Sequence, residues 1–460
     1  MVDAGALLLL GNAAVVAPAG HGKTEVIAQA AAMGRRSLIL THTHAGVHAI
    51  RARLKRMRVP TAQVAVDTIA GWCTRYAYAF PGVAQPPDGD PQNNAEWEQL
   101  YRGTTQALQI AAIRQVVAAS YDRILVDEYQ DCNGLQHELV RALSSIVPTI
   151  VFGDPMQGIF EFAGATLNWN TDIHPHFPLA GTLDVPHRWS EKNPALGQWI
   201  AETRQKLLLG QPIDLQDPRI NARSSSNAFD MAILFEGMEG REGSFAAIHC
   251  NKGICYRLAS AANGGYQAIE EVAAKGLMDF AREWDAAADA RGKFQSLKTL
   301  TDACYHKITP DPGTPPDPTD EAVRLALQDT ARGLIYGNGA AAAVKFIALA
   351  RTRPAWKMYR SGLWRDAENA CNELAAERTE SMVEAANRIK QRTSNMGRRL
   401  PTRTVSTPLL LKGLEFDHVV IPDATHFLSE RQAQAKLFYV AISRATQSLT
   451  IGSSSRFLNF

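Results

Sequence analysis

Short apolar runs alternate with helical patterns over the first third of the chain. Four of these runs read as buried strands, and each is followed by a loop that carries Gly, Thr or Asp: Asn12–Val16, Ser37–Thr41, Arg123–Val126 and Thr149–Phe152. Such continuous apolar runs are typical of parallel strands, which are covered on both faces. The pattern therefore predicts a parallel α/β sheet, whose ligands bind at the carboxyl ends of the strands.

A second α/β pattern begins near Leu183. Its strand candidates are Ser244–Cys250, Arg403–Ser406, Val419–Ile421 and Leu449–Gly452. Residues 256–400, between them, are rich in Ala, Arg and Glu at helical spacing and are interrupted by a proline-rich loop, Pro310–Pro318. We predict a first α/β domain at 1–185 with a small insertion at about 72–118, a second at 186–255 and 401–460, and a helical insertion at 256–400.

Composition narrows the class of protein without identifying it. The chain of 460 residues is longer than one core usually supports, and its 46% hydrophobic and 20% charged residues are those of an ordinary globular protein. The apolar stretch Ala4–Leu10 is too short to span a bilayer, so we expect it to lead into the first buried strand and expect no membrane partner. The net charge of +2 is uninformative about partners. The six cysteines are scattered without a CxxC pair, which argues against a zinc site or disulfide framework and fits a reducing cytoplasm.

The first candidate for chemistry is the segment Ala17–Thr24, which reads APAGHGKT between a strand and a helical run. Its glycines allow the backbone N–H groups of the loop, from Ala19, Gly20, His21 and Gly22, to turn toward phosphate oxygens at a helix N-terminus. Lys23 would reach the β- and γ-phosphates of a nucleotide, and the Thr24 hydroxyl would bind Mg²⁺. Ala17 stands where the strict pattern has glycine, so this segment alone is also compatible with a glycine-rich loop beside a stray lysine.

The second candidate is an apolar strand, Arg123–Val126, that ends in the adjacent carboxylates Asp127 and Glu128 about 100 residues after the glycine loop. Asp127 would hold Mg²⁺, directly or through water, and Glu128 would orient and deprotonate the attacking water. A solvated acidic pair is the ordinary alternative for such a dipeptide, but the glycine loop disfavours it. The next strand ends in Gly153-Asp154-Pro155-Met156-Gln157, where Gln157 could sense the γ-phosphate.

With DEYQD at 127–131 and GDPMQ at 153–157 in one chain, the sequence resembles the UvrD/Rep/PcrA branch of superfamily 1 DNA helicases, in a compact form. Further motifs follow in the order of the family. They are LTHTHA at 40–45, DTIA at 67–70, PHRW at 186–189, LKGLEF at 411–416 and LFYVAISRA at 437–445. The resemblance implies two RecA-like P-loop NTPase domains with parallel sheets, plus reduced, mainly helical insertions.

The resemblance also assigns roles at the nucleotide. Arg188 and Arg444 match the arginines that reach the γ-phosphate, where they would neutralise charge in the transition state. His187 matches an aromatic residue that stacks on adenine, and Glu415 lies in the KGLEF motif expected at the nucleotide. Binding would close the crevice between the domains, and hydrolysis would open it. A surface salt bridge is the alternative for either arginine.

The same resemblance predicts contacts to single-stranded DNA. The implied residues lie in two strand-end loops and after the glutamine loop: Thr41, His42, His44, Thr68, Phe160 and Phe162. Aromatic side chains at the last two positions would stack on bases in a sequence-tolerant way. A core position is the alternative for a phenylalanine. For the basic residues Arg51, Arg53, Lys55, Arg56 and Arg58, a solvated helix face is favoured over phosphate contacts.

Several positions depart from the family pattern. Val2 stands where relatives carry a glutamine that reads adenine, and His187 replaces the usual tyrosine. The sequence therefore supports a preference for ATP over other triphosphates less strongly than it supports hydrolysis itself. Leu409 replaces a histidine that links the DNA and ATP sites, and His42 and His44 replace Phe and Asn. The insertions are also short, which weakens the case for processive unwinding. In this compactness the chain resembles the helicase-like subunit of the Gabija anti-phage system.

We therefore expect an ATP- and Mg²⁺-dependent DNA helicase or translocase, stimulated by single-stranded or partly double-stranded DNA, with the 3′–5′ polarity that the resemblance implies. The alternative is a module that senses nucleotide or DNA for a partner nuclease, for example in antiviral defence, without productive unwinding. A small-molecule kinase would explain the glycine loop but neither KGLEF nor DEYQD.

Overall fold

The computed structural model describes residues 3–91, 93–159, 167–236, 242–269, 273–309, 313–337, 339–396, 401–431 and 433–460. The chain forms two compact units. The first comprises Met1–Ile213, Glu430–Thr446 and Asn459–Phe460, and the second comprises Asp214–Ser429 and Gln447–Leu458. Each unit contains one six-stranded sheet, so the predicted α/β fold with two parallel sheets is confirmed.

The first unit is built on the sheet β3-β2-β4-β5-β1-β6. Its strands are β1 (Ala13–Val16), β2 (Ser37–Thr41), β3 (Val64–Thr68), β4 (Arg123–Val126), β5 (Thr149–Gly153) and β6 (Leu179–Thr182). Neighbours pair in parallel, with Leu40 opposite Val126 and Val126 opposite Val151. The carboxyl ends of the central strands therefore lie along one edge of the sheet, where the parallel-sheet rule places ligands.

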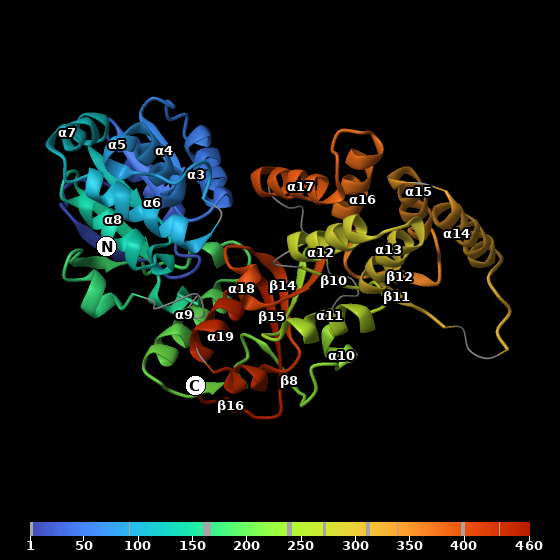
Figure 1. Ribbon diagram of the computed structural model, residues 1–460. Coiled ribbons are helices and arrows are strands. Elements are labelled where there is room, and N and C mark those ends of the chain that lie inside the picture. Colours follow the sequence, from blue (N-terminus) through green and yellow to red (C-terminus); the bar gives the residue numbers. More distant parts are fainter. Residues whose placement is uncertain are drawn as a thin grey trace. The chain divides into compact units, whose positions relative to one another are not determined.

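Helices cover both faces of this sheet (Figure 1). The helices of the first unit are α1 (Ala4–Leu8), α2 (Lys23–Met33), α3 (His44–Arg56), α4 (Ile69–Ala79), α5 (Pro81–Ala84), α6 (Asn94–Ala107), α7 (Ala111–Ser120), α8 (Gly134–Ser144), α9 (Pro194–Leu208) and α19 (Gln434–Ile442), with short turns η1 (Tyr129–Asp131), η2 (Pro155–Gln157), η4 (Trp169–Ile173) and η5 (His187–Trp189). Alternate strand residues enter opposite cores: Ile124 and Val126 pack with α4, α6 and α8, and Leu125 packs with α2 and α3.

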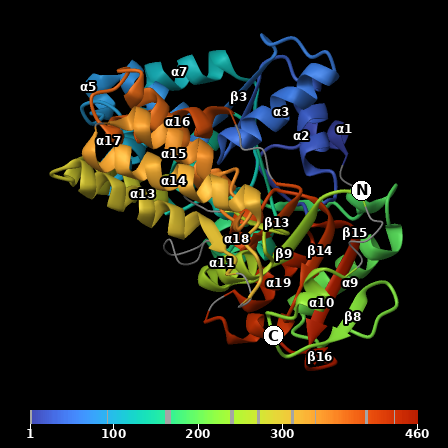
Figure 2. The same ribbon diagram turned by 90° about the vertical axis from the view of Figure 1, so that its right-hand side faces the viewer.

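The second unit has the sheet β10-β13-β9-β14-β15-β8, whose strands β13, β9 and β14 run side by side in Figure 2. Its strands are β8 (Asn221–Ser224), β9 (Phe245–Ile248), β10 (Gln267–Ala268), β13 (Arg403–Ser406), β14 (Phe416–Ile421) and β15 (Ala445–Ser453), with a separate short pair β7 (Ile213–Asp214) and β16 (Phe457–Leu458). The accompanying helices are α10 (Met231–Leu234), α11 (Lys252–Ala261), α18 (Pro408–Leu411) and the turn η6 (Ala424–Ser429).

Six helices of the second unit pack into a cluster of their own, which we call the helical cluster. They are α12 (Ala273–Ala286), α13 (Ala290–Cys304), α14 (Pro318–Tyr336), α15 (Ala340–Ala350), α16 (Ser361–Ala375) and α17 (Met382–Met396), with the antiparallel ribbon β11 (Tyr305–Lys307) and β12 (Trp356–Met358). Trp284 and Trp364 are buried in its core. Among the described residues, no helix combines the length and apolarity that crossing a membrane requires.

The structure adds detail to the sequence analysis in three places. Ala4–Leu8 forms a helix, α1, because the Asp3 carboxylate caps it by accepting from Ala6 N at 2.8 Å. Residues 256–269 finish α11 and add β10 to the second sheet, whereas the sequence analysis placed them in the helical insertion. The first compact unit also continues past residue 185 to Ile213. The predicted domain boundaries stay a prediction.

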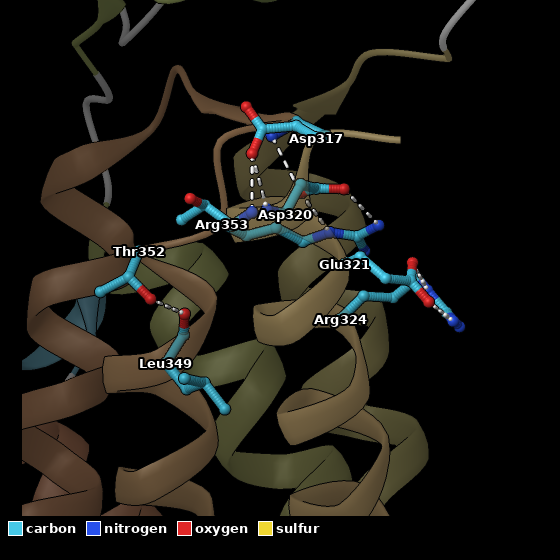
Figure 3. A network of polar contacts seen from close by, with 9 residues as sticks. Asp317, Asp320, Glu321, Arg324, Leu349, Thr352 and Arg353 are labelled. Carbon is cyan, nitrogen blue, oxygen red and sulfur yellow. Dashed lines mark hydrogen bonds and ion pairs between the residues drawn. The ribbon is translucent and has the colours of Figure 1, made fainter. Parts of the chain in front are cut away.

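One polar network joins the start of α14 to the loop after α15 (Figure 3). Asp317 caps α14 by accepting from Thr319 N at 2.7 Å. Asp320, on the first turn, accepts from Arg353 Nε at 3.1 Å and from Ala355 N at 3.2 Å. Burial would raise the pKa of Asp320, but the hydrogen bonds from Arg353 and Ala355 outweigh it and hold that pKa below its ordinary value.

The first prediction concerns this network. A carboxyl with a depressed folded pKa contributes stability above its unfolded pKa of about 3.9 and loses it as the pH falls through the folded pKa. Asp320→Asn should therefore lower the free energy of unfolding by roughly 1–2 kcal/mol at pH 7, and the deficit should shrink in acid. Urea denaturation and hydrogen exchange of α14, at pH 7 and near pH 3, measure it. Glu321→Gln, one position on, is the control, because the ion pair of Glu321 with Arg324 is more than one third exposed and its loss should change little.

Candidate functional site

The glycine loop lies between β1 and α2, as the sequence predicts. Gly20 and Gly22 adopt φ values of 74° and 80°, a left-handed conformation that favours glycine. Ala17 does not occur among the described non-glycine residues with positive φ, so a side chain at the first motif position is tolerated. Ala17 N instead donates to Gly153 O at 2.8 Å, which continues the sheet into the loop.

Lys23, the first residue of α2, is held against the two carboxylates at the end of β4. Its Nζ lies 2.8 Å from Asp127 Oδ1 and 2.5 Å from Glu128 Oε1. Lys23 and Asp127 are buried, and Glu128 is about one third exposed. Glu128 has a φ of 57°, which is strained for a non-glycine residue and recurs at functional sites at a cost of roughly 1–3 kcal/mol. The structure therefore joins three of the predicted residues in one cluster.

Charge at this cluster is set by burial and by pairing. Burial alone would lower the pKa of Lys23, but the carboxylates of Asp127 and Glu128 outweigh it and hold that pKa above its ordinary value. Burial raises the pKa of the Asp127 carboxyl, and the Lys23 ammonium opposes the rise. In the loop, burial lowers the pKa of His21, whose Nδ1 lies 2.8 Å from Ala19 O and so carries the proton.

A buried polar network connects the acidic pair to the turn after β5. Gln130 donates from Nε2 to Glu128 Oε2 at 2.5 Å, and its Oε1 accepts from Asp154 N at 3.0 Å. Asp154, fully buried, pairs with Arg204 of α9 at 2.7 Å and accepts from Gln157 Nε2 at 3.2 Å. Gln157 is thus positioned by Asp154 within the same network as Glu128. Arg204 also lies over the ring of Tyr439, 6.0 Å from its centroid.

Two segments distant in sequence pack on the glycine loop. Arg188 N, in η5, donates to Gly20 O at 2.9 Å. A Cβ on Gly20 would lie 2.7 Å from the Trp189 ring, and one on Gly22 would lie 3.1 Å from the exposed ring of His187. From α19, the Tyr439 hydroxyl accepts from Ala19 N at 3.0 Å. The glycines are therefore needed both for the backbone conformation and for this close approach.

The two predicted arginines lie at the same segments. Arg188 donates from Nη1 to Ser443 O at 2.6 Å, and the neighbouring Trp189 donates to Ala445 O at 2.6 Å. Arg444 is almost fully buried. It donates to Val440 O at 2.9 Å and to Ser443 Oγ at 2.7 Å. Ser443 thus links the side chains of both arginines in the first unit, although their contact with a phosphate stays a prediction.

The predicted DNA-contacting residues of the strand-end loops also gather. Thr41 and Thr68 are opposite each other at the ends of β2 and β3. Both threonines are buried, and the Thr68 hydroxyl accepts from Gly71 N at 2.8 Å to cap α4. His44 is exposed at the start of α3, whereas His42 lies 3.4 Å from Cys132 Sγ. The histidines are more available to a ligand than the threonines.

Phe160 and Phe162 lie outside the described residues. Glu415 is exposed in the second unit, before β14. Thr24 is the second residue of α2, next to Lys23, as predicted.

Three residues that the sequence analysis did not single out complete the site: Gln130, Arg204 and Tyr439. Gln130 and Tyr439 lie within motifs that were recognised, but Arg204 carries no local signal.

A glycine loop between a parallel strand and a helix, with its lysine against strand-end carboxylates, defines a P-loop NTPase. Two family models match the chain. The UvrD/REP helicase N-terminal domain matches residues 89–178, and the UvrD-like helicase C-terminal domain matches residues 405–451. These two matches support a UvrD-type helicase of superfamily 1.

Similarity to individual proteins is more distant. A search of curated proteins gives no match. Among solved structures, the chain is similar to an arterivirus helicase, nonstructural protein 10, in a complex with DNA. The identity is 15%, the match covers 52% of this chain and 47% of that chain, and the TM-score is 0.27. This chain therefore spans about half the length of that structure.

The second prediction concerns the buried pair Arg204–Asp154. Arg204→Met would leave the Asp154 carboxylate buried without a cation, so the free energy of unfolding should fall by about 3–5 kcal/mol. Adding Asp154→Asn should restore part of that loss, because the charge is removed as well. Thermal and urea denaturation measure both variants. Arg102→Ala breaks the exposed pair with Glu98 on α6 and should be nearly neutral. Equal losses in the Arg204 and Arg102 variants would contradict this assignment.

Proposed function

We propose that the first unit binds and hydrolyses ATP with Mg²⁺, and that hydrolysis drives movement along DNA. The observation that supports hydrolysis is the Lys23 ammonium, which lies between Asp127 and Glu128 beside the glycine loop. The donor set fits a nucleotide with its metal: N–H groups at a helix N-terminus, a lysine, the Thr24 hydroxyl and a strand-end carboxylate. An ammonium already neutralises Asp127, a role that a divalent cation would share.

Thr24 and Asp127 would hold the metal, which supplies charge neutralisation on the β- and γ-phosphates. Lys23 would turn from Glu128 toward the phosphates, since one ammonium cannot fully serve both. This movement would separate the Lys23 ammonium from Glu128, whose carboxylate accepts from Gln130 and would take the proton of an attacking water. Gln157, whose side chain donates to Asp154 in the same network, would orient that water.

The arginines would complete the charge balance. Arg188 is anchored at Gly20 through its backbone, so its guanidinium is supplied close to the loop that holds the phosphates. Arg444, one residue from the Ser443 carbonyl that Arg188 contacts, would add a second positive charge as the transition state develops. His187, exposed at Gly22, is the candidate for stacking on the base.

The third prediction separates binding from hydrolysis. Glu128→Gln keeps the shape of the side chain but removes the base, so ATP turnover should fall about 10²–10⁴-fold while nucleotide affinity is retained. Lys23→Ala should lower both turnover and affinity. Phosphate release and binding of a fluorescent ATP analogue measure the two effects.

Lys206→Ala is the matched control for this pair, because Lys206 is an exposed lysine on α9 away from the network. It should behave as the unmodified chain does. Normal ATP hydrolysis by a folded Lys23→Ala protein would end the proposal.

The family matches support DNA as the polymer along which the protein moves, and the resemblance suggests 3′–5′ polarity. The fourth prediction is therefore that single-stranded DNA increases ATP turnover, and that the chain displaces an oligonucleotide from a partial duplex with a 3′ tail but not from one with a 5′ tail. Glu128→Gln should abolish displacement. DNA-stimulated turnover without displacement from either substrate would favour the alternative function, a sensing module that acts with a nuclease partner.

A further inference from the structure

A cavity of about 760 Å³ lies in the first unit, beside α3 and the edge strand β3. Helix α3 and strand β3 are neighbours, as Figure 2 shows. Four basic side chains line the cavity: Arg51, Lys55, Arg58 and Arg75. Asp67 is the acidic residue among the lining residues. Asp67 is paired with Arg75, so the remaining three charges give this cavity a net positive character.

We propose that this basic cavity binds the phosphodiester backbone of a DNA arm that extends beyond the strand-end loops. The proposal rests on the DNA binding proposed above and assigns it a second contact surface. The Asp67 end of the cavity adjoins Thr68, so the cavity continues from the predicted strand-contacting loops along the edge of the sheet. Phosphates following that path would meet Lys55 and Arg58 in turn.

The backbone at Arg58 supports a role for its charge. Helix α3 ends in a Schellman motif, in which Val59 N donates to Leu54 O and Arg58 N donates to Lys55 O, each at 3.0 Å. Arg58 occupies the left-handed position of that motif with φ 57°, where glycine is the usual residue. An arginine thus occupies a position that favours glycine, and its side chain lines the cavity.

The edge of the sheet argues for a polyanion over a peptide strand. Arg51 donates from Nη2 to the Val66 carbonyl at 2.8 Å, so a backbone group that an added strand would need is already bonded. In contrast, among the described residues Lys55 and Arg58 have no ion-pair partner. Arg53, which points to Glu25 at 2.7 Å, and Arg56 do not line the cavity.

The fifth prediction tests this surface by DNA binding at several salt concentrations. Lys55→Glu with Arg58→Glu should weaken binding about tenfold or more at low salt, and the slope of log K against log salt should lose about 0.7–0.9 for each phosphate contact removed. Fluorescence anisotropy with a single-stranded and a partly double-stranded probe shows which DNA arm occupies the cavity, because the larger loss falls on that probe. ATP turnover without DNA should be unchanged.

Two further variants keep the test decisive. Arg56→Glu reverses one charge on the exposed side of α3, as Lys55→Glu alone does, and should affect binding far less than Lys55→Glu. Arg58→Gly removes the charge while relieving the left-handed backbone, so its melting temperature should be equal or higher although its DNA affinity is lower. A folded Arg58→Gly protein with unaltered affinity and salt slope, or an Arg56→Glu loss equal to that of the cavity variant, would overturn the site. A chain that binds no DNA in any form would overturn the proposed function together with it.

Discussion

The ion pairs of Lys23 with Asp127 and Glu128 fix the geometry on which the rest of the site depends. They bring the first turn of α2 against the end of β4, so the glycine loop is held at the carboxyl edge of the sheet. Because a buried ammonium is costly without partners, the two carboxylates keep Lys23 charged in the folded protein. The same carboxylates are the groups proposed to serve the metal and the water, and in the structure both are paired with the Lys23 ammonium.

A second layer of contacts keeps this cluster in place. Gln130 reaches from Glu128 to Asp154, and Arg204 neutralises Asp154 in the interior. In this way the strand-end motifs after β4 and β5 act as one unit, although each is recognised in the sequence by itself. The Gln of DEYQD, to which the sequence analysis assigned no role, connects the Glu128 carboxylate to the backbone of Asp154.

Much of the fold follows from local sequence. The strands β2 and β4 coincide with their predicted ranges, because apolar runs between polar turns signal strands buried on both faces. Strand β13 also coincides with its predicted range, although Val405 is its one apolar residue. The edge strands β3 and β6 were not predicted, since an edge strand is partly exposed and its pattern is mixed. Lys23, Asp127 and Glu128 could be predicted because each lies in a contiguous motif beside a strand. Arg204 could not, since its importance comes from a partner 50 residues away.

The hydroxyl of Tyr439 has a consequence for how the protein registers an occupied site. It accepts the Ala19 N–H, one of the donors that a glycine loop offers to phosphate. A phosphate oxygen that takes this donor must displace the phenol. Helix α19 would then lose an anchor at the moment the loop is filled, and Ser443 and Arg444 follow Tyr439 on the same segment. The exchange of one hydrogen-bond acceptor, from the phenol to a phosphate, would thereby couple ligand binding at the glycine loop to the position of α19 and of the residues that follow it.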